Sequence, residues 1–287
     1  FTGSTRAGIA VAQAAAVTVK RVCQELGGKS AMIITEGIDL ESVVPECVWL
    51  CMENTGQSCN AGTRLLVPES LHDEVVEIAK RTAESYVVGN PSDEATQLGP
   101  LANRGQFEKV LAILNYAETA GIKPVTGGSG PVLGCSEGYF IQPTIFSNLS
   151  KEQLIAREEV FGPVLPVFVY DDLSDVIDVI RLNSDPLALY IFSKHEDEIN
   201  YISNRVNAGN VAINDTLLEY IQNDLPFGGV GKSGSGKYHG KEGFEAFSNK
   251  QATFIQSGLG SFTGTKLLYP PYGKIAHLMM KVLRRWP

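Results

Sequence analysis

Apolar residues recur every three or four positions in several stretches of the chain, and this spacing predicts amphipathic helices. The stretch 70–86 is the clearest, because it opens on a serine that can cap the helix. In another, Pro45 stands in the early turn or kinks the helix. Helices are predicted at residues 5–16, 38–54, 70–86, 104–121, 173–184 and 196–206.

Between these helices lie short apolar runs rich in β-branched and aromatic residues, which are typical of strands. The stretch 88–100 is rich in turn-forming residues and predicts a long loop. Strands that alternate with helices indicate an α/β fold with a mostly parallel sheet. Strands are predicted at residues 19–26, 31–35, 63–69, 123–128, 139–146, 162–170, 188–193 and 209–215.

Composition and charge narrow the class of protein. The chain has 287 residues, 44% of them hydrophobic and 20% charged, which is the mix of a globular protein with a sizeable core. Its net charge of −8 argues against non-specific binding to nucleic acid. No apolar run reaches the roughly 18 residues that a membrane-spanning helix needs.

The five cysteines are odd in number and lack the spacing of a disulfide framework. They indicate free thiols in a reducing compartment, so we expect a cytoplasmic location. Cys47 and Cys51 stand four residues apart on a predicted helix, but no other ligand accompanies them. We therefore expect two core cysteines there and no metal site.

One cysteine, Cys59, lies in the small and polar run GQSCNAG, between a predicted helix and a predicted strand. We interpret this thiol as presented for reaction. The four histidines give no sign in the sequence of pairing with it, so a carboxylate is the alternative base. Glu25, in QELGGKS, precedes two glycines that let its side chain project into a cleft.

Five short motifs follow one another along the chain, and together they carry more information than any one alone. They are FTGSTRAG at 1–8, ELGGKS at 25–30, GQSC at 56–59, EEVFGPV at 158–164 and PFGGVGKSGSG at 226–236. In this order and at these spacings they resemble the aldehyde dehydrogenase superfamily, over essentially the whole chain. The resemblance implies an α/β catalytic domain with a mostly parallel sheet, together with the remnant of a Rossmann-type cofactor domain.

The resemblance implies oxidation of an aldehyde to a carboxylic acid with NAD or NADP. The thiolate matching Cys59 attacks the carbonyl carbon, hydride leaves to the nicotinamide, and a thioester remains. The carboxylate matching Glu25 then activates the water that hydrolyses it. Cysteine suits the first step as a strong nucleophile, and a desolvated glutamate suits the second as a general base.

Other motif residues match the family's cofactor and substrate positions. The glycine turn before the first helix matches the pyrophosphate site, since a helix N-terminus favours anions. Glu158 stands beside the matching glutamate, so either one could be the ribose ligand. Phe227 matches a wall of the substrate pocket, although a lone phenylalanine is more often in the core. The residues that match the cofactor site are Gly3, Ser4, Gly8, Leu26, Gly27, Glu159 and Phe161.

The resemblance also divides the chain into three parts. Residues 1–27 match the C-terminal remnant of the NAD(P)-binding domain and residues 28–232 the catalytic thiol domain. Residues 233–287 match a C-terminal helix, an interface strand at 251–258 and an amphipathic tail, which implies a homo-oligomer for the full-length protein. The family's ribose-binding lysine and oxyanion-hole asparagine would lie upstream of residue 1, so we interpret the chain as an N-terminally truncated fragment that is poorly active alone.

The two halves resemble different branches of the family. Residues 1 to about 150 resemble the broad tetrameric type, whereas residues from about 157 onward, with DPLALYIFS and KYHGKEGFEAFS, resemble the class 3 or fatty-aldehyde type. The tail KIAHLMMKVLRRWP predicts a cationic amphipathic helix, which can lie peripherally on an anionic membrane or pack on a neighbouring domain or subunit. Its apolar face comprises Ile275, Leu278, Met279, Val282, Leu283 and Trp286.

Two other functions are compatible with the same residues. Cys59 and Glu25 could run a redox-independent thiol esterase reaction, in which an acyl group passes from an ester to the thiol and then to water. The chain could also be a non-catalytic remnant that at most binds partners. Aldehyde-dependent reduction of a nicotinamide cofactor distinguishes the first hypothesis from both.

Overall fold

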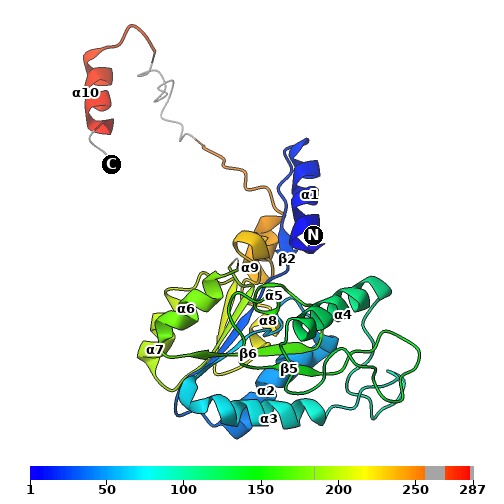
Figure 1. The fold of residues 1–287 in the computed structure, drawn as a ribbon. Coiled ribbons are helices and arrows are strands. Elements are labelled where there is room, and N and C mark those ends of the chain that lie inside the picture. The colour runs from blue at the N-terminus through cyan, green and yellow to red at the C-terminus, as the bar shows by residue number, and fades with distance from the viewer. Residues whose placement is uncertain (184, 256–268, 285–287) are drawn as a thin grey trace. The chain divides into compact units, whose positions relative to one another are not determined.

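The computed structural model describes residues 1–183, 185–255 and 269–284. They belong to two compact units, Phe1–Phe247 and Ser248–Pro287. The larger unit carries every residue that the sequence predicts to be part of the site. Figure 1 shows the elements in their order along the chain.

A six-stranded parallel sheet forms the centre of the larger unit, in the order β5-β6-β4-β3-β7-β8. Met32 of β3 pairs with Leu65 of β4, and Ala31 pairs with Leu189 of β7. Parallel neighbours need crossover connections, which the helices supply. The predicted α/β fold with a mostly parallel sheet is confirmed. The strands are β3 (Ala31–Ile34), β4 (Leu65–Pro68), β5 (Thr144–Phe146), β6 (Val164–Tyr170), β7 (Ala188–Phe192) and β8 (Asn210–Ile213).

Helices cover both faces of this sheet (Figure 1). Successive residues of β3 point to opposite faces, so Met32 and Ile34 join one core with α2 and α3, while Ala31 and Ile33 join another with α6 and α7. A third core packs α4 against the end of the sheet at β5. Burial on both faces explains why the central strands are almost continuously apolar. The helices are α2 (Leu40–Met52), α3 (His72–Glu84), α4 (Arg104–Thr119), α6 (Leu173–Arg181) and α7 (Glu196–Ser203).

A separate three-stranded sheet, in the order β1-β2-β9, holds the segment that precedes β3. Glu25 lies on its middle strand, with Thr2 opposite on the parallel side and Gly234 opposite on the antiparallel side. The sheet therefore brings three of the five sequence motifs together. Its strands are β1 (Thr2–Gly3), β2 (Gln24–Leu26) and β9 (Gly234–Ser235).

The first helix, α1 (Thr5–Ala16), packs closely on this small sheet. Ser4 caps it, because its hydroxyl oxygen accepts from the backbone N–H of Ala7 at 3.3 Å. A Cβ at Gly8 would lie 2.5 Å from a methyl carbon of Leu26. Gly8 is therefore a packing position of the helix on β2.

Three predicted strands are wrong in extent. In 19–26 only Gln24–Leu26 forms a strand, because Val19 has a φ of 55° in the turn that follows α1. The stretch 123–128 forms no strand and makes only a single bridge from Thr126 to Ile145. In 139–146 only the last three residues pair with a neighbour. Residue type favoured extended backbone at these places, but a strand also needs a hydrogen-bonding partner.

Several short elements complete the larger unit. They are α5 (Leu154–Arg157), α8 (Leu218–Ile221), α9 (Gly240–Ala246) and the 3-10 turns at Glu53–Gly56, Glu69–Leu71 and Gly231–Ser233. Among them, α5 contributes Ile155 and Ala156 to the cores.

The smaller unit contains the helix α10 (Lys274–Leu283), at the position of the predicted amphipathic tail. The five predicted apolar positions within α10 are exposed, and Trp286 lies outside the described residues. In the predicted interface strand, residues 251–255 have no regular secondary structure and 256–258 lie outside the described part. None of the described helices has the length and apolar character needed to cross a bilayer.

A fully buried arginine, Arg64, joins the starts of β3 and β4 to the end of α6. Its guanidinium donates to the backbone oxygen of Val179 at 2.8 Å, to Asn183 Oδ1 at 3.2 Å and to the backbone oxygen of Lys29. Burial lowers the pKa of Arg64 to about 9, which still leaves it charged at neutral pH. This one side chain therefore satisfies three acceptors inside the protein.

Replacing the buried guanidinium should destabilise the larger unit substantially. Arg64→Met keeps most of the apolar stem but leaves three buried acceptors without a donor, so we expect a loss of about 2–4 kcal/mol in the free energy of unfolding. Urea denaturation followed by circular dichroism measures this loss.

Arg81→Met is the matched control, because Arg81 is exposed and pairs with Glu41 at the surface. It should leave the urea midpoint nearly unchanged, as exposed ion pairs contribute little. Equal midpoints for the Arg64 and Arg81 variants would contradict a structural role for Arg64.

Candidate active site

Cys59 lies in a tight loop between α2 and β4. The preceding 3-10 turn contains two residues in the left-handed region, and Gly56 follows with a φ of 71°. A Cβ at Gly56 would lie 2.2 Å from the backbone of Gly162. Because only glycine fits this contact, the loop can press against the 158–164 motif. Two motifs that are about a hundred residues apart in the sequence thus meet at Cys59.

The thiol of Cys59 is half-buried, and its surroundings favour the protonated form. Burial raises the pKa of Cys59, and the negative charge of Glu25 raises it further. Backbone hydrogen bonds from Cys59 and Asn60 oppose this rise by stabilising the thiolate. The thiol is therefore neutral at rest near neutral pH, and it needs a proton acceptor to become a nucleophile.

Glu25 is a buried carboxyl whose two oxygens have no hydrogen-bond partner within the described structure. Burial raises the pKa of Glu25 to about 7, against the opposing positive charge of Lys237. The Lys237 ammonium donates to the backbone oxygens of Gly209, at 2.7 Å, and Gly228. Glu25 is thus poised to exchange a proton near neutral pH, as a general base requires.

Cys59 and Glu25 line the same cavity, of about 290 Å³. Eight of the ten predicted site residues share it, which brings the thiol and the carboxyl together with most of the residues that match the cofactor site. Gly8 and Phe227 are the two exceptions. Gly8 lies under Leu26 instead. The lining residues are Thr2, Gly3, Ser4, Glu25, Leu26, Gly27, Cys59, Gln106, Lys109, Glu159 and Phe161.

Glu159 closes one side of the cavity. Its Oε1 accepts from the backbone N–H of Gly28 at 3.1 Å, and a Cβ on Gly27 would lie 2.1 Å from its Oε2. Burial raises the pKa of Glu159, while the Gly28 N–H and the Lys109 charge lower it. The neighbouring Glu158 does not line this cavity. The geometry therefore favours Glu159 of the two glutamates.

Two residues of α4, Gln106 and Lys109, also line the cavity, although the sequence gave no reason to select them. Gln106 donates to the backbone oxygens of Val160 at 2.9 Å and Phe161 at 2.7 Å, and Lys109 donates to that of Glu159 at 2.8 Å. Phe161 has a φ of 57°, a rare conformation for a bulky residue. The only signal available was that both polar residues stand on one face of the helix, three positions apart.

Phe227 is buried in a group of aromatic rings beside the cavity. Its ring lies edge-on to Tyr220 and Tyr238, with centroids 5.1 Å and 5.6 Å apart, and 5.8 Å from His239. The charges of Glu25 and Cys59 contribute to a raised pKa of Tyr238, after the larger effect of burial. These rings therefore lie close to the reactive pair, as a wall of a pocket for an apolar substrate would.

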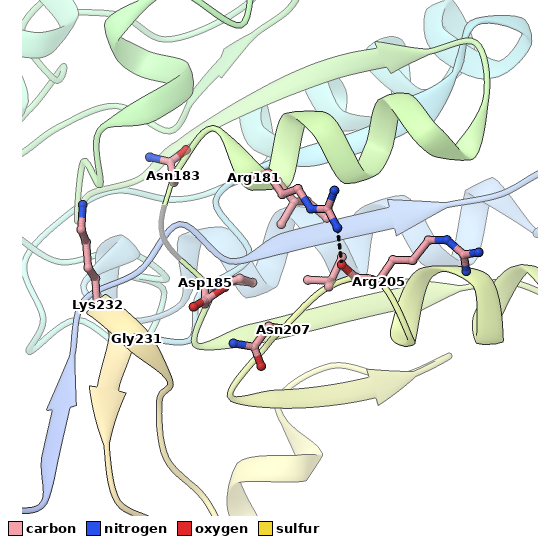
Figure 2. Close-up of a pocket in the computed structure, with 10 residues that line it drawn as sticks. Arg181, Asn183, Asp185, Arg205, Asn207, Gly231 and Lys232 are labelled. Carbon is pink, nitrogen blue, oxygen red and sulfur yellow. Dashed lines mark hydrogen bonds between the residues drawn. The ribbon is translucent and has the colours of Figure 1, made fainter.

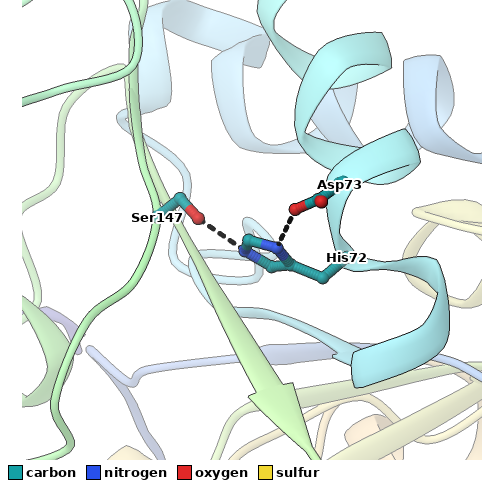
Figure 3. Close-up of polar contacts among 3 residues, drawn as sticks. All are labelled: His72, Asp73 and Ser147. Carbon is teal, nitrogen blue, oxygen red and sulfur yellow. Dashed lines mark hydrogen bonds and ion pairs between the residues drawn. The ribbon is translucent and has the colours of Figure 1, made fainter.

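Two other histidines of the larger unit do not line the cavity: His195 at the start of α7 and His72 on α3. Figure 3 shows His72 between Asp73, at 2.9 Å, and Ser147, at 2.6 Å. This resembles a serine–histidine–aspartate arrangement, but the Asp73 side chain is fully exposed and cannot hold the imidazole in a dry site. We interpret it as a link between α3 and the end of β5.

A larger cavity, of about 600 Å³, lies elsewhere in the same unit (Figure 2). Arg181, Arg205 and Lys232 contribute its positive charge, and Arg181 donates to the backbone oxygen of Arg205 at 3.2 Å. It contains neither Cys59 nor any other predicted site residue. Size therefore does not select the reactive site, whereas the meeting of a thiol and a carboxyl does.

Two features of the cavity would suit part of a nicotinamide cofactor. Gly3 and Ser4 place the N-terminus of α1 at its edge, where helix N–H groups favour an anionic pyrophosphate. One oxygen of Glu159 is committed to Gly28, which leaves the second to accept from a ribose hydroxyl. No group of three or more potential metal ligands occurs among the described residues.

Known proteins match both the sequence and the fold. The aldehyde dehydrogenase family matches residues 1–253. A 3-succinoylsemialdehyde-pyridine dehydrogenase of Pseudomonas sp is 44% identical over 258 residues, which are 90% of this chain and 54% of the relative. The chain spans about half the length of the curated relatives it matches.

Solved structures agree. Aldehyde dehydrogenase C of Pseudomonas syringae, a cysteine-to-alanine mutant with NAD+ and octanal, has a TM-score of 0.80 and 41% identity, over 86% of this chain and 50% of that one. An aldehyde dehydrogenase of Mycobacterium tuberculosis in complex with NAD+ has a TM-score of 0.85 and 35% identity, over 91% and 53%.

Removing the charge of Glu25 should stabilise the chain at high pH. The folded pKa, about 7, exceeds the ordinary 4.5, so ionisation costs stability progressively as the pH rises through this window. Glu25→Gln avoids that cost. We expect a gain of about 1–3 kcal/mol in the free energy of unfolding above pH 7, and almost none below pH 4.5.

Urea denaturation across this pH range measures the difference. Glu77→Gln serves as the control, since Glu77 is exposed on α3, and it should show no gain that grows with pH. A Glu25→Gln gain that is the same at both ends of the range would contradict a raised pKa.

Proposed function

The chain belongs to the aldehyde dehydrogenase family, and on that premise we propose that the whole protein oxidises an aldehyde to a carboxylic acid with NAD+ or NADP+. The observation that carries the proposal is that Cys59 and Glu25 line one cavity with Glu159, Phe161 and the start of α1. A thiol nucleophile, a general base and a cofactor site are thus in one place.

Cys59 acts first. Once its proton is removed, the thiolate adds to the aldehyde carbonyl carbon and forms a thiohemiacetal. Glu25 lines the same cavity and is suited to take that proton, because its pKa of about 7 lets it exist as a carboxylate near neutral pH. The backbone N–H groups at Cys59 and Asn60 stabilise the thiolate while it attacks.

The residues around the cavity fit NAD(P)+ as the partner in this step. When bound, the cofactor accepts the hydride of the Cys59 adduct, which leaves a thioester on the sulfur. The start of α1 would hold the pyrophosphate and Glu159 a ribose. Phe161, Leu26 and Gly27 would then lie near the nicotinamide half.

Glu25 acts again in the second step, after it has released the proton taken from Cys59 to bulk water. Its carboxylate removes a proton from water, the hydroxide adds to the thioester carbonyl, and the Cys59 thiolate leaves with the bonding electrons. Both oxygens of Glu25 are free of hydrogen bonds in the described structure, so a water can occupy them. The product is the carboxylic acid.

This activity is proposed for the whole protein, because the chain matches about half of its relatives' length. We expect the 287-residue chain alone to be poorly active, since no residue in it matches the family's oxyanion-hole asparagine. Such a donor is worth about 10²–10³ in rate. A homo-oligomer and peripheral membrane contact through α10 remain proposals of the same kind.

The substrate class follows from the ring cluster around Phe227. We propose an aldehyde with an apolar aliphatic or aromatic body, because the aromatic rings of Phe227, Tyr220 and Tyr238 offer mainly apolar surface. The octanal complex of the Pseudomonas syringae enzyme is consistent with it.

A second activity is available without a cofactor. Because the thiol and the carboxyl share the cavity, an ester could acylate Cys59 and Glu25 could direct water onto the thioester. We propose this thiol esterase reaction as the one that the 287-residue chain is best able to perform.

Two substitutions separate the proposed steps in the whole protein. Cys59→Ser should abolish aldehyde-dependent formation of reduced cofactor. Glu25→Gln should lower the steady-state rate by about 10²–10⁴, the usual contribution of a general base. If Glu25 is needed mainly for thioester hydrolysis, this variant should still release one burst of reduced cofactor. Stopped-flow absorbance of the reduced cofactor measures both.

The same variants in the 287-residue chain test the second activity with a chromogenic ester. Cys51→Ser is the matched control, because Cys51 is fully buried and away from the cavity. An unchanged aldehyde-dependent signal in Cys59→Ser would overturn the dehydrogenase proposal, and equal ester hydrolysis by Cys59→Ser and wild type would overturn the esterase proposal.

A further inference from the structure

A buried polar chain lies behind the Cys59 loop, on the side away from Glu25's strand. Tyr190 of β7 is fully buried, and its hydroxyl oxygen lies 2.9 Å from the backbone oxygen of Asn60 and 3.0 Å from Glu219 Oε1. Asn60 directly follows Cys59. The hydroxyl therefore connects the nucleophile loop to a carboxyl more than 150 residues away.

The hydrogens available on these polar groups decide which group donates in each hydrogen bond. The Tyr190 hydroxyl has one proton, but both of its neighbours are acceptors if Glu219 is ionised. A protonated Glu219 resolves this, because its O–H donates to the phenol oxygen and the phenol donates to Asn60. Burial is the main cause of a raised pKa at Glu219 and Asp215 adds to it, while hydrogen bonds from its own backbone, Tyr190 and Asn60 oppose the rise.

Asn60 connects these hydrogen-bonded side chains to the Cys59 thiol. Its backbone N–H is one of the groups that stabilise the Cys59 thiolate, and its backbone oxygen is the acceptor of Tyr190. Both backbone polar groups of Asn60, its N–H and its C=O, therefore have a hydrogen-bond partner. Fixing the oxygen limits rotation of the Asn60 backbone and keeps its N–H directed at the sulfur.

The segment that carries Glu219 is itself held in place. Leu217, just before α8, has a φ of 62°, and the Thr216 hydroxyl donates to Glu46 Oε1 of α2 at 2.7 Å. The Asn60 side chain also interacts with the half-buried Glu219 carboxyl and stabilises its charged form. A left-handed residue beside a carboxyl that is tied to the nucleophile loop indicates a position kept for function.

We propose that Tyr190 and Glu219 are positioning residues for the nucleophile, which act through the Asn60 backbone to stabilise the Cys59 thiolate. The inference rests on the proposed role of Cys59 and adds two residues that lie outside the cavity. They touch neither substrate nor cofactor, so their effect should appear in the reactivity of the thiol itself.

Alkylation by iodoacetamide tests this without aldehyde or cofactor. Peptide mass spectrometry follows Cys59 separately, because Cys23 and Cys135 are also partly accessible. Tyr190→Phe should slow alkylation of Cys59 about fivefold at neutral pH, the effect of one hydrogen bond, and move its pH midpoint upward.

Tyr170→Phe is the matched control, since Tyr170 is also buried and donates to a strand carbonyl, that of Ile34, at 2.8 Å. It should leave the rate at Cys59 within about twofold, which is below the effect of one hydrogen bond. Equal slowing by both tyrosine variants would overturn the proposal, because it would then reflect general loss of packing.

The carboxyl gives a second, independent readout. Glu219→Gln can still donate to the phenol and should keep the alkylation rate, whereas Glu219→Leu cannot and should slow it as Tyr190→Phe does. Equal rates for Glu219→Leu and wild type would overturn the role of Glu219. Because the reagent needs no dehydrogenase chemistry, these outcomes are separate from a failure of the proposed function.

Discussion

The site depends on one constraint, the tie between the starts of two adjacent parallel strands. Arg64, at the start of β4, donates to the backbone of Lys29, just before β3, and Thr63 donates to Ser30 at 3.1 Å. Glu25 precedes β3, and Cys59 precedes β4, by the same six residues. Because these starting points are fixed side by side, the two segments that leave the sheet there meet again over one cavity. The reactive pair therefore lies beyond the amino ends of the strands.

Burial without partners gives this site its electrostatic character. Burial disfavours the charged forms of both Glu25 and Cys59, and the charge of Glu25 raises the pKa of Cys59 further. A proton can then pass between them without creating two adjacent anions. Lys29 shows the same effect with the opposite sign, since burial and the charge of Arg64 lower the pKa of its amine to about 7. The protein thus surrounds its reactive pair with groups whose charge is easily changed.

Sequence pattern predicted the parts of the structure that are local or repetitive. Strands that alternate with helices indicated the parallel sheet, and the resemblance to the aldehyde dehydrogenase family indicated eight residues that do share the cavity. The pattern failed where a long-range partner decides the outcome. Residues 19–26 were too long as a strand because only Gln24–Leu26 has neighbours to pair with.

For the same reason, the sequence did not predict the residues that support the site. Gln106 and Lys109 act on backbone oxygens about 50 positions away, and Tyr190 and Glu219 reach Asn60 only through the fold. No spacing rule connects such positions.

The protonated resting state of Cys59 has one more consequence. Peroxide oxidises the thiolate and not the thiol, so a sulfur that ionises only when it attacks is protected from sulfenic acid formation between turnovers.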